Sequence, residues 1–414
     1  PRRRPTTPSL RPDAMTAPRP HLVIVGAGMV TARLLEEIAR REPTRFRITV
    51  VGAEASAPYD RIQLSAVLAG TRSAASLDLL GDLADRLALD LVRGRAVTAL
   101  DPRRRRITLA DGTTIGFDLL VLATGAEPVR LPLPGAEREG VRTFRDLDDV
   151  DVLARARGRA VVVGGGLLGL EAAAGLRARG LDVALVHLLP WLMERQLDEA
   201  GGAALASAIE RLGIRLHLGV ESEAIVGDDR VRGLRLATGA TLAADLVVMA
   251  VGIRPRVALA RTAGLACGRG IQVDDGLATS EPGVFALGEC AEHRGTCYGL
   301  VAPLYAQAAA LAGRLCGEAG ARYTGSVPFT SLKVAGVEVF SAGAVEGDDA
   351  IVLRDPARGV YRKLVLAGER LAGAVLVGDA AEGAWYARLI EDGTPVGGWR
   401  ERLMLGRAYL DDAA

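Results

Sequence analysis

The first patterned stretch of the chain is an apolar run over residues 21–25 that ends in a glycine turn. Residues 29–40 follow with apolar side chains at helical spacing, and residues 47–51 form another short apolar run. The pattern predicts a strand, a tight turn at Gly26 and Gly28, a helix and a second strand. Two strands joined in this way make a βαβ unit, in which the strands run parallel.

A second stretch repeats this plan further along the chain. The apolar run 159–163 precedes a helical stretch, and residues 182–187 predict the next strand. Between run and helix stand the three glycines of a complete dinucleotide-binding fingerprint, Gly164, Gly166 and Gly169. The first stretch has Thr31 where the third glycine would stand. Both units later close in a similar phrase, one at Asp118–Gly125 and the other at Asp245–Gly252.

A glycine turn between a strand and a helix binds the pyrophosphate of a dinucleotide at the helix N-terminus. An acid after the second strand accepts hydrogen bonds from the ribose, and Glu54 has that place in the first unit. Two such units in one chain imply two dinucleotides, which a protein needs chiefly to pass electrons between them. The predicted fold class is therefore α/β, with two nested Rossmann-like dinucleotide-binding domains.

Composition excludes several other functions. The 414 residues include 51 Lys and Arg against 50 Asp and Glu, and this balance provides no broad attraction for nucleic acid. The longest apolar run, 160–170, is shorter than the roughly 18 to 20 residues of a membrane-spanning helix, so we expect no membrane association. The chain has only two lysines, Lys333 and Lys363, and neither follows a glycine. This excludes the phosphate-binding loop of nucleotide triphosphatases, which needs a Gly-Lys pair.

Several phrases stand out along the chain, namely residues 23–28, 59–61, 123–125, 161–171 and 279–289. Together they resemble the two-dinucleotide flavoprotein reductases that bind FAD and NAD(P)H. Further phrases are most similar to the flavin module at the N-terminus of NAD(P)H nitrite reductase large subunits; they are residues 61–70, 187–198, 288–303 and 331–336. The resemblance covers roughly residues 21–405.

This resemblance implies a glutathione-reductase-like pair of domains followed by a small C-terminal α+β domain. We predict a disordered lead-in over 1–20, a discontinuous FAD-binding domain over 21–141 and 258–321, an NAD(P)-binding domain over 142–257 and the C-terminal domain over 322–414. Apolar alternation in the last of these predicts strands at 334–341, 360–366 and 371–377 and a helix near 382–390.

In the family, the first glycine turn holds the FAD pyrophosphate, which assigns that role to Gly26 and Gly28. The acid that holds the FAD ribose corresponds to Glu54. Arg61 would face the phosphates or the flavin as a charge-assisted donor, although an ordinary surface arginine on a loop is an equally good interpretation.

The resemblance assigns four further residues to the flavin. Thr124 and Gly125 would let the chain pass close to the cofactor, unless they form only a turn at a strand end. Gly288 precedes Glu289, which stands where most relatives carry Asp and would accept hydrogen bonds from the ribityl hydroxyls. A helix from about Pro303 would aim its positive N-terminal end at the flavin.

The second glycine turn would hold the nicotinamide coenzyme, with Gly252 closing the same unit. Glu171 lies near the nicotinamide in the resemblance; the alternative is a plain acid on a helix face. His187 stands where an NADH enzyme commonly has Glu and where an NADPH enzyme prefers Arg. A structural residue at the strand end is an equally good interpretation of His187, so the choice between NADH and NADPH stays open.

The four cysteines argue against thiol chemistry. Disulfide reductases of this fold need two close cysteines beside the flavin, and neither a CxxC nor a CxxxxC pair occurs. Cys290 and Cys297 could meet in space, but packed free thiols are the favoured interpretation. With no export signal in residues 1–20, the cysteines indicate a reducing compartment, the cytoplasm. The four histidines lack the spacing of metal ligands, so we expect no metal site.

The function predicted from these observations is an FAD-dependent NAD(P)H oxidoreductase that passes electrons to a separate redox protein in nitrite or nitrate assimilation. The acceptor would be a ferredoxin-like protein, a rubredoxin-like protein or a sirohaem enzyme, since the chain ends at Ala414, before the iron–sulfur and sirohaem regions of the large subunits. Hydride moves directly from nicotinamide to flavin, so no catalytic acid or base is assigned. The sequence is also compatible with a homodimer.

Three alternatives remain. The first is a ferredoxin or rubredoxin reductase of another pathway. A thiol or peroxide reductase and a non-catalytic redox sensor built on the same folds are less favoured.

Overall fold

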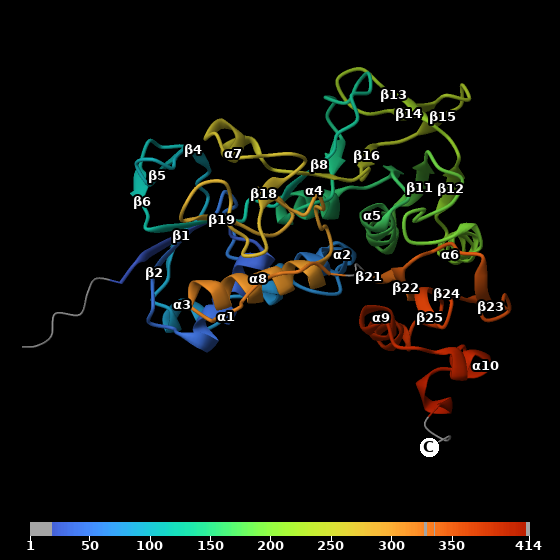
Figure 1. Ribbon diagram of the computed structural model, residues 1–414. Coiled ribbons are helices and arrows are strands. Elements are labelled where there is room, and N and C mark those ends of the chain that lie inside the picture. The colour runs from blue at the N-terminus through green and yellow to red at the C-terminus, as the bar shows by residue number, and fades with distance from the viewer. Residues whose placement is uncertain (1–18, 327–328, 335, 411–414) are drawn as a thin grey trace, which may run out of the picture.

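The computed structural model describes residues 19–326, 329–334 and 336–410. The lead-in predicted over residues 1–20 therefore lies almost entirely outside the described residues. Two α/β halves lie side by side, and a C-terminal domain follows beside the second (Figure 1). The first half contains a parallel sheet in the order β19 (Val284–Ala286), β7 (Leu119–Leu122), β1 (His21–Val25), β2 (Arg47–Val51) and β3 (Asp90–Val92).

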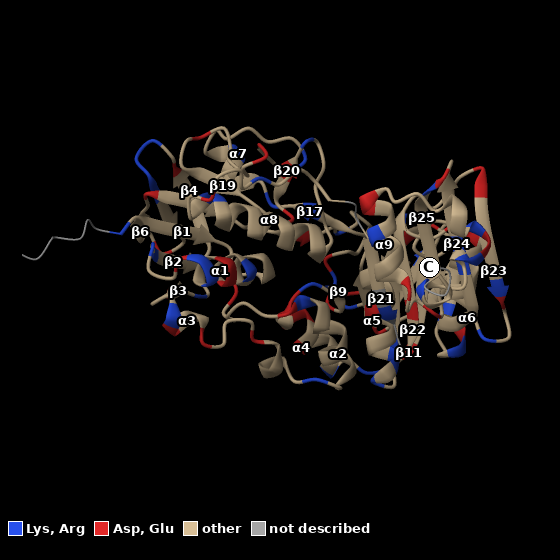
Figure 2. Ribbon diagram, turned by 60° about the horizontal axis from the view of Figure 1, so that its bottom comes forward, with Lys and Arg blue, Asp and Glu red and all other residues tan. Residues whose placement is uncertain are grey.

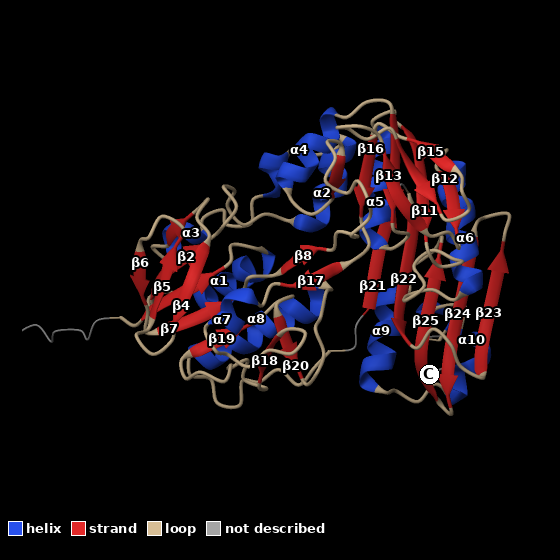
Figure 3. Cartoon of the chain, turned by 90° about the horizontal axis from the view of Figure 1, so that it is seen from above, coloured by secondary structure: helices blue, strands red, loops and turns tan. Residues whose placement is uncertain are grey.

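Helices cover one face of this first sheet. Helices α1 (Met29–Arg41) and α8 (Val301–Leu315) pack against each other, and α3 (Leu83–Arg86) lies beside them (Figure 3). Their apolar side chains and those of the strands form one buried core, as the helical spacing of the sequence predicts. An antiparallel meander packs on the other face of the sheet, with strands β4 (Val97–Asp101), β5 (Arg106–Leu109) and β6 (Thr114–Gly116).

The second half repeats this plan. Its parallel sheet has the order β12 (Arg215–Leu218), β11 (Asp182–His187), β10 (Arg159–Val163), β16 (Leu246–Met249) and β9 (Val141–Thr143). Its helices are α4 (Leu147–Arg155), α5 (Leu167–Ala178) and α6 (Glu199–Arg211), and its meander is β13 (Ser222–Val226), β14 (Gly233–Leu236) and β15 (Thr241–Ala243). Because β9 begins at Val141, this sheet includes the last residue of the first range predicted for the FAD-binding domain.

The two halves are joined by a pair of short antiparallel strands, β8 (Ala126–Pro128) and β17 (Ile253–Pro255). Helix α2 (Leu64–Ala69) of the first half packs on α5 of the second, where a side chain at Gly175 would meet Leu68. The chain then returns to the first half through α7 (Ala258–Thr262) and the parallel pair β18 (Ile271–Val273) and β20 (Ala291–His293). The chain therefore passes from the first half to the second and back, and these connections join the two halves that carry the glycine turns.

The C-terminal domain is an antiparallel sheet in the order β21 (Phe329–Val334), β22 (Val337–Gly343), β25 (Arg370–Val377), β24 (Val360–Ala367) and β23 (Asp349–Asp355). The strand predicted at 334–341 corresponds to β22, but its predicted start is too early: Val334 is the last residue of β21, and Gly336, with a positive φ of 92°, lies in the turn before β22. The helix predicted near 382–390 is confirmed as α9 (Gly383–Asp392), and the short α10 (Arg400–Leu403) follows it.

A buried polar contact fastens this domain to the second half. Asp198 caps the N-terminus of α6, and its carboxylate accepts hydrogen bonds from Tyr361 Oη at 2.6 Å and from Lys363 Nζ at 3.0 Å. Both partners come from β24. The C-terminal domain is thereby held against the helices of the second half.

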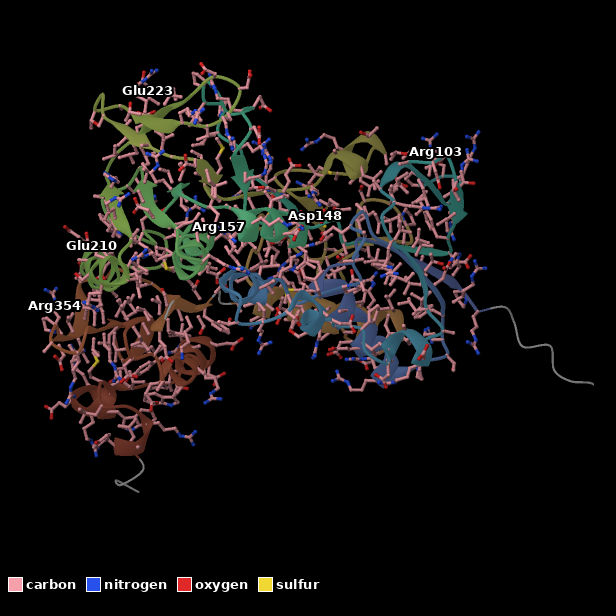
Figure 4. The ribbon with its side chains drawn as sticks, turned by 180° about the vertical axis from the view of Figure 1, so that it is seen from behind. Arg103, Asp148, Arg157, Glu210, Glu223 and Arg354 are labelled. Carbon is pink, nitrogen blue, oxygen red and sulfur yellow. The ribbon has the colours of Figure 1, made fainter. Side chains whose placement is uncertain are left out.

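Charged residues are spread over the whole molecule. Basic and acidic segments alternate along both halves and the C-terminal domain (Figure 2). Arg103 lies at the outer end of the first half, Asp148 lies between the halves, and Arg354 lies on the C-terminal sheet (Figure 4). In the part of the chain that the structure describes, no helix is both long and apolar enough to cross a membrane.

Candidate functional sites at the two glycine turns

The first glycine turn joins β1 to α1 at the carboxyl edge of the first sheet. Gly26 has a φ of 116°, and a Cβ there would collide with the carbonyl oxygen of Ala123. Gly28 is the N-cap of α1, and a Cβ added to it would meet no atom within 4 Å. The turn therefore leaves open space in front of a helix N-terminus, where backbone N–H groups attract an anion.

The second glycine turn joins β10 to α5 with the same geometry. Gly164 has a φ of 118°, and Gly166 caps α5 with no atom within 4 Å of an added Cβ. A Cβ on Gly169 would overlap the carbonyl oxygen of Gly164, so only glycine fits there without a shift of the helix. Both turns pass the test that a pyrophosphate imposes, namely a bare cradle at a helix N-terminus.

Glu54 and Arg61 form one cluster beside the first turn. Arg61 makes an ion pair with Glu54, and Tyr59 Oη donates to the other carboxylate oxygen of Glu54 at 2.8 Å. The Arg61 guanidinium also lies 4.7 Å from the centre of the Tyr59 ring. Burial raises the pKa of Tyr59, so its hydroxyl remains a hydrogen-bond donor. The sequence placed Glu54 and Arg61 at separate contacts, whereas the structure brings them together.

A second ion pair crosses between the halves. Arg145, on the loop between β9 and α4, pairs with Glu289, which follows β19. Both side chains are largely buried, and the carboxylate lies 3.7 Å from the point that a Cβ on Gly125 would occupy. Arg61 reaches the same loop and donates to the backbone oxygen of Arg145 at 2.9 Å. Thus the two acids and the two arginines form one continuous row.

Arg145 was missed by the sequence analysis. It belongs to no glycine fingerprint, and its only local signal is its position directly before Asp146, the N-cap of α4. Its partner Glu289 lies 144 residues away in the sequence. The contact exists only because the two halves face each other.

The remaining predicted residues of the first half lie at strand ends. Thr124 Oγ1 donates to the backbone oxygen of Arg256 at 2.8 Å, next to the crossing between the halves. Gly288 has a φ of 87°, and its N–H donates to Gln307 Oε1 of α8 at 2.8 Å. Helix α8 begins at Val301, and its side chain Gln307 thereby holds the turn that carries Glu289.

Glu171 lies on α5, half-buried, without a hydrogen bond or an ion pair among the described residues. Burial raises the pKa of its carboxyl to about 7, from an ordinary value of 4.5. Gly252 follows β16 with a φ of 116° and no atom within 4 Å of an added Cβ. Both residues belong to the second half, as predicted.

His187, the last residue of β11, is held by two contacts of its ring. The N–H of Gly165 donates to His187 Nδ1 at 3.1 Å, and Nε2 lies 3.1 Å from Glu194 Oε2. Because Nδ1 accepts a hydrogen bond, the ring proton is on Nε2, which donates to Glu194. Both nitrogens are therefore used inside the protein.

All four cysteines are free thiols. Cys290 is fully buried, its Sγ lies 3.4 Å from the backbone oxygen of Leu122, and burial raises its pKa, which disfavours the reactive thiolate. Within residues 19–326, 329–334 and 336–410, no group of three or more His, Cys, Asp or Glu residues is arranged to hold a metal ion.

The sequence of the chain matches two family models. The model "Pyridine nucleotide-disulphide oxidoreductase" matches residues 20–313, which include both glycine turns. The chain belongs to this family. The model "Rubredoxin NAD+ reductase C-terminal domain" matches residues 328–394. Membership of the family implies FAD and NAD(P)H as the two cofactors, in agreement with the two cradles.

Individual relatives agree with this membership. The chain is 46% identical over 369 residues to the nitrite reductase [NAD(P)H] of Bacillus subtilis (strain 168), covering 87% of this chain and 46% of that protein. It is 37% identical to the ferredoxin reductase component of the chlorobenzene dioxygenase of Cupriavidus sp. (strain PS12), covering 90% of this chain and 92% of that one. The chain thus spans about half the length of the nitrite reductase and nearly all of the ferredoxin reductase component.

A solved structure has the same architecture. The covalent putidaredoxin reductase–putidaredoxin complex includes a chain that superposes with a TM-score of 0.84 at 28% identity, covering 92% of this chain and 94% of that chain. The match extends over the two halves and the C-terminal domain.

Proposed function

We propose that the chain takes a hydride from NAD(P)H in its second half and passes the electrons through FAD in its first half to a separate redox protein. The observation that carries this proposal is the pair of bare glycine turns, each at a helix N-terminus, in halves joined by β8, β17 and the Arg145–Glu289 pair. Two dinucleotides held in one molecule are what electron transfer between them requires.

FAD, when bound, supplies the change from two-electron to one-electron transfer. In the first half, Gly26 and Gly28 let the backbone approach its pyrophosphate. Arg61 then offers a positive charge near the phosphates, and Glu54 offers carboxylate oxygens toward the ribose. Tyr59 and Arg61 hold that carboxylate in place, which reduces the conformational entropy lost when the cofactor binds.

The flavin end of the first site is formed by residues from three segments. Thr124 and Gly125 supply a strand end without bulky side chains, and Glu289 after Gly288 supplies acceptors for hydroxyl groups. Arg145 compensates the charge of Glu289 and ties the site to the second half. In our proposal, the N-terminal end of α8 faces the flavin, and its partial positive charge favours negative charge on the flavin.

The second half binds and orients the nicotinamide coenzyme. Gly164, Gly166 and Gly169 approach its pyrophosphate, and Gly252 keeps the opposite strand end clear. Glu171, with a pKa near 7, holds or releases a proton near neutral pH beside the nicotinamide. The hydride step itself requires orientation and water exclusion rather than an acid or a base.

The acceptor in our proposal is a redox protein of nitrite or nitrate assimilation. The name of the B. subtilis relative supports this choice. An iron–sulfur ferredoxin of another pathway is the second candidate, supported by the dioxygenase reductase component and by the putidaredoxin complex. The free thiols agree with a location in the reducing cytoplasm. We also propose a homodimer, which light scattering would detect.

Anaerobic titration tests the proposed function. Purified chain with bound FAD should lose its yellow colour when one equivalent of NADH or NADPH is added. Steady turnover should then follow when a ferredoxin, a rubredoxin or a sirohaem enzyme is supplied. A chain that cannot take up FAD, or whose flavin neither coenzyme reduces, would refute the proposal; reduction without turnover on any of the three acceptors would refute the choice of acceptor.

A further inference from the structure

The second half carries a closed ring of hydrogen bonds at the end of β11 that the function above does not use. The N–H of Gly165 donates to His187 Nδ1, and Nε2 of the same ring lies 3.1 Å from Glu194. Met193, the residue before Glu194, donates its backbone N–H to the backbone oxygen of Gly165 at 3.1 Å. Glu194 is therefore linked to the glycine turn through the imidazole of His187 and through the backbone of Met193.

The backbone of the residues in this circle of hydrogen bonds has an uncommon conformation at Met193 and a close packing contact at Gly165. Met193 has a φ of 54°, a left-handed conformation that is uncommon for residues with a side chain and that persists only where the surroundings enforce it. A Cβ on Gly165 would come within 2.7 Å of the His187 ring, so the turn needs glycine there for the ring to pack. These features fix the position of one carboxylate.

The carboxylate of Glu194 remains available to a ligand. Its side chain is 23% exposed, and only Oε2 has a partner among the described residues, which leaves Oε1 free. The two residues after His187 are exposed leucines, Leu188 and Leu189, with relative exposures of 62% and 39%. An acceptor oxygen beside a pyrophosphate cradle, with exposed apolar side chains next to it, matches a ribose followed by a flat base.

We infer that Glu194, oriented by His187, accepts hydrogen bonds from the adenosine ribose of NADH and repels the 2′-phosphate of NADPH, so that the chain prefers NADH. The inference rests on the proposed function, since it concerns the coenzyme of the second half. His187 occupies the position at which a ribose-binding acid would ordinarily stand. Its imidazole instead orients the carboxylate of Glu194, seven residues further along, which takes the place of that acid.

Charge explains why this arrangement discriminates. A carboxylate accepts hydrogen bonds from the 2′- and 3′-hydroxyls of NADH, and the same negative charge is unfavourable beside a phosphate. The charge that could oppose this preference is Arg195, an exposed residue adjacent to Glu194 that has no ion pair among the described residues. Of the two residues, only Glu194 is held in place by a hydrogen bond, to the imidazole of His187, so its effect should prevail.

Calorimetric titration of the FAD-loaded chain with NAD⁺ and with NADP⁺ tests the inference, since it measures binding without turnover. The wild-type chain should bind NAD⁺ at least about tenfold more tightly than NADP⁺. Glu194→Gln keeps the shape and removes the charge, and should bring the two dissociation constants within about threefold of each other. Equal affinities in the wild type, or an unchanged preference in Glu194→Gln, would overturn the inference.

Arg195→Gln is the matched control at the neighbouring exposed position. It should leave the ratio of the two dissociation constants unchanged. If the wild type instead prefers NADP⁺ and Arg195→Gln abolishes that preference, Arg195 is the ligand of a 2′-phosphate and the inference is wrong. Failure of the proposed function has a different signature, because then neither coenzyme reduces the flavin, whatever the binding ratio.

Two variants of His187 test its positioning role. Gln can place an amide N–H near the position of Nε2, whereas Asn can accept only the N–H of Gly165. His187→Gln should therefore retain most of the preference for NAD⁺, and His187→Asn should bind both coenzymes with a ratio close to that of Glu194→Gln. Equal ratios in His187→Gln and His187→Asn would show that the ring acts only as packing and would refute the positioning role.

Discussion

The two halves solve one packing problem with different residues at the same position of the glycine fingerprint. In the second half, Gly169 lets α5 lie so close to β10 that any side chain would overlap the carbonyl oxygen of Gly164. In the first half, Thr31 has this position, is fully buried, and its Oγ1 donates to the carbonyl oxygen of Gly26 at 2.6 Å. The third glycine is thus needed only where the helix approaches closely; elsewhere a hydroxyl satisfies the turn.

The halves also differ two residues further along the same helices. Arg33 on α1 pairs with Glu37 at 2.5 Å, so its charge is compensated within the helix. Glu171 has the equivalent place on α5 and has no charged partner among the described residues. The first half neutralises its helix charge internally, whereas the second leaves an acid available to a ligand.

The largest effect is expected when the threonine found at Thr31 in the first half is introduced at the corresponding position of the second half, Gly169. Gly169→Thr should destabilise the second half by about 3 kcal/mol or more, because the added atoms overlap backbone that cannot move freely. Coenzyme binding should be lost while FAD is retained, which calorimetry and flavin absorbance would measure. If this variant bound NADH with wild-type affinity, the close approach of α5 would not be a requirement of the site.

The next effect concerns the pair that links the halves. Arg145→Gln leaves the largely buried Glu289 without its partner and should weaken FAD binding by about 2 to 3 kcal/mol. The dissociation constant of FAD would be measured by fluorescence after removal of the cofactor. Arg155→Gln, which breaks an exposed pair with Asp151 in α4, is the matched control and should change FAD binding by less than about 0.5 kcal/mol. Similar losses in both variants would contradict a specific role for Arg145.

A pH series compares the unpaired acid with its counterpart. The pKa of Glu171 is raised to about 7, so the folded chain keeps a proton that the unfolded chain releases near 4.5. Stability is therefore lost as the pH rises between these values and then levels off. Glu171→Gln lacks this loss and should gain about 2 kcal/mol on the wild type between pH 5 and pH 8, followed by thermal unfolding. Arg33→Gln should show no such gain; a wild type and Glu171→Gln with parallel pH profiles would contradict the raised pKa.

The smallest effect tests the hydroxyl of the first half. Thr31→Val removes the hydrogen bond to Gly26 with little change of shape and should cost about 1 kcal/mol, with FAD retained. Thr31→Ser keeps the hydroxyl and should retain more of the stability than Thr31→Val. The midpoints of thermal unfolding give the comparison, and a valine variant as stable as the wild type would show that the bond contributes nothing.

Local pattern was sufficient to predict the elements that carry both turns. Strands Arg159–Val163 and Asp182–His187 coincide with the predicted apolar runs, and Gly26 and Gly164 have the positive φ that a tight turn requires. The repeat of that pattern predicted two dinucleotides, and the resemblance of the wider phrases to a known family supplied FAD and NAD(P)H, which the family match supports. Apolar periodicity and glycine act within a few residues, which is why the sequence alone reveals them.

Contacts between distant segments decided the rest. The pairing of Arg145 with Glu289, the closeness of α5 to its strand at Gly169, and the ring that joins His187 to Glu194 have no signal in local periodicity. Each depends on where a side chain from one segment meets the backbone or charge of another after folding. The sequence by itself therefore determined which chemistry the chain contains, and the tertiary structure decided which residues hold it in place, because packing and electrostatics act through space and not along the chain.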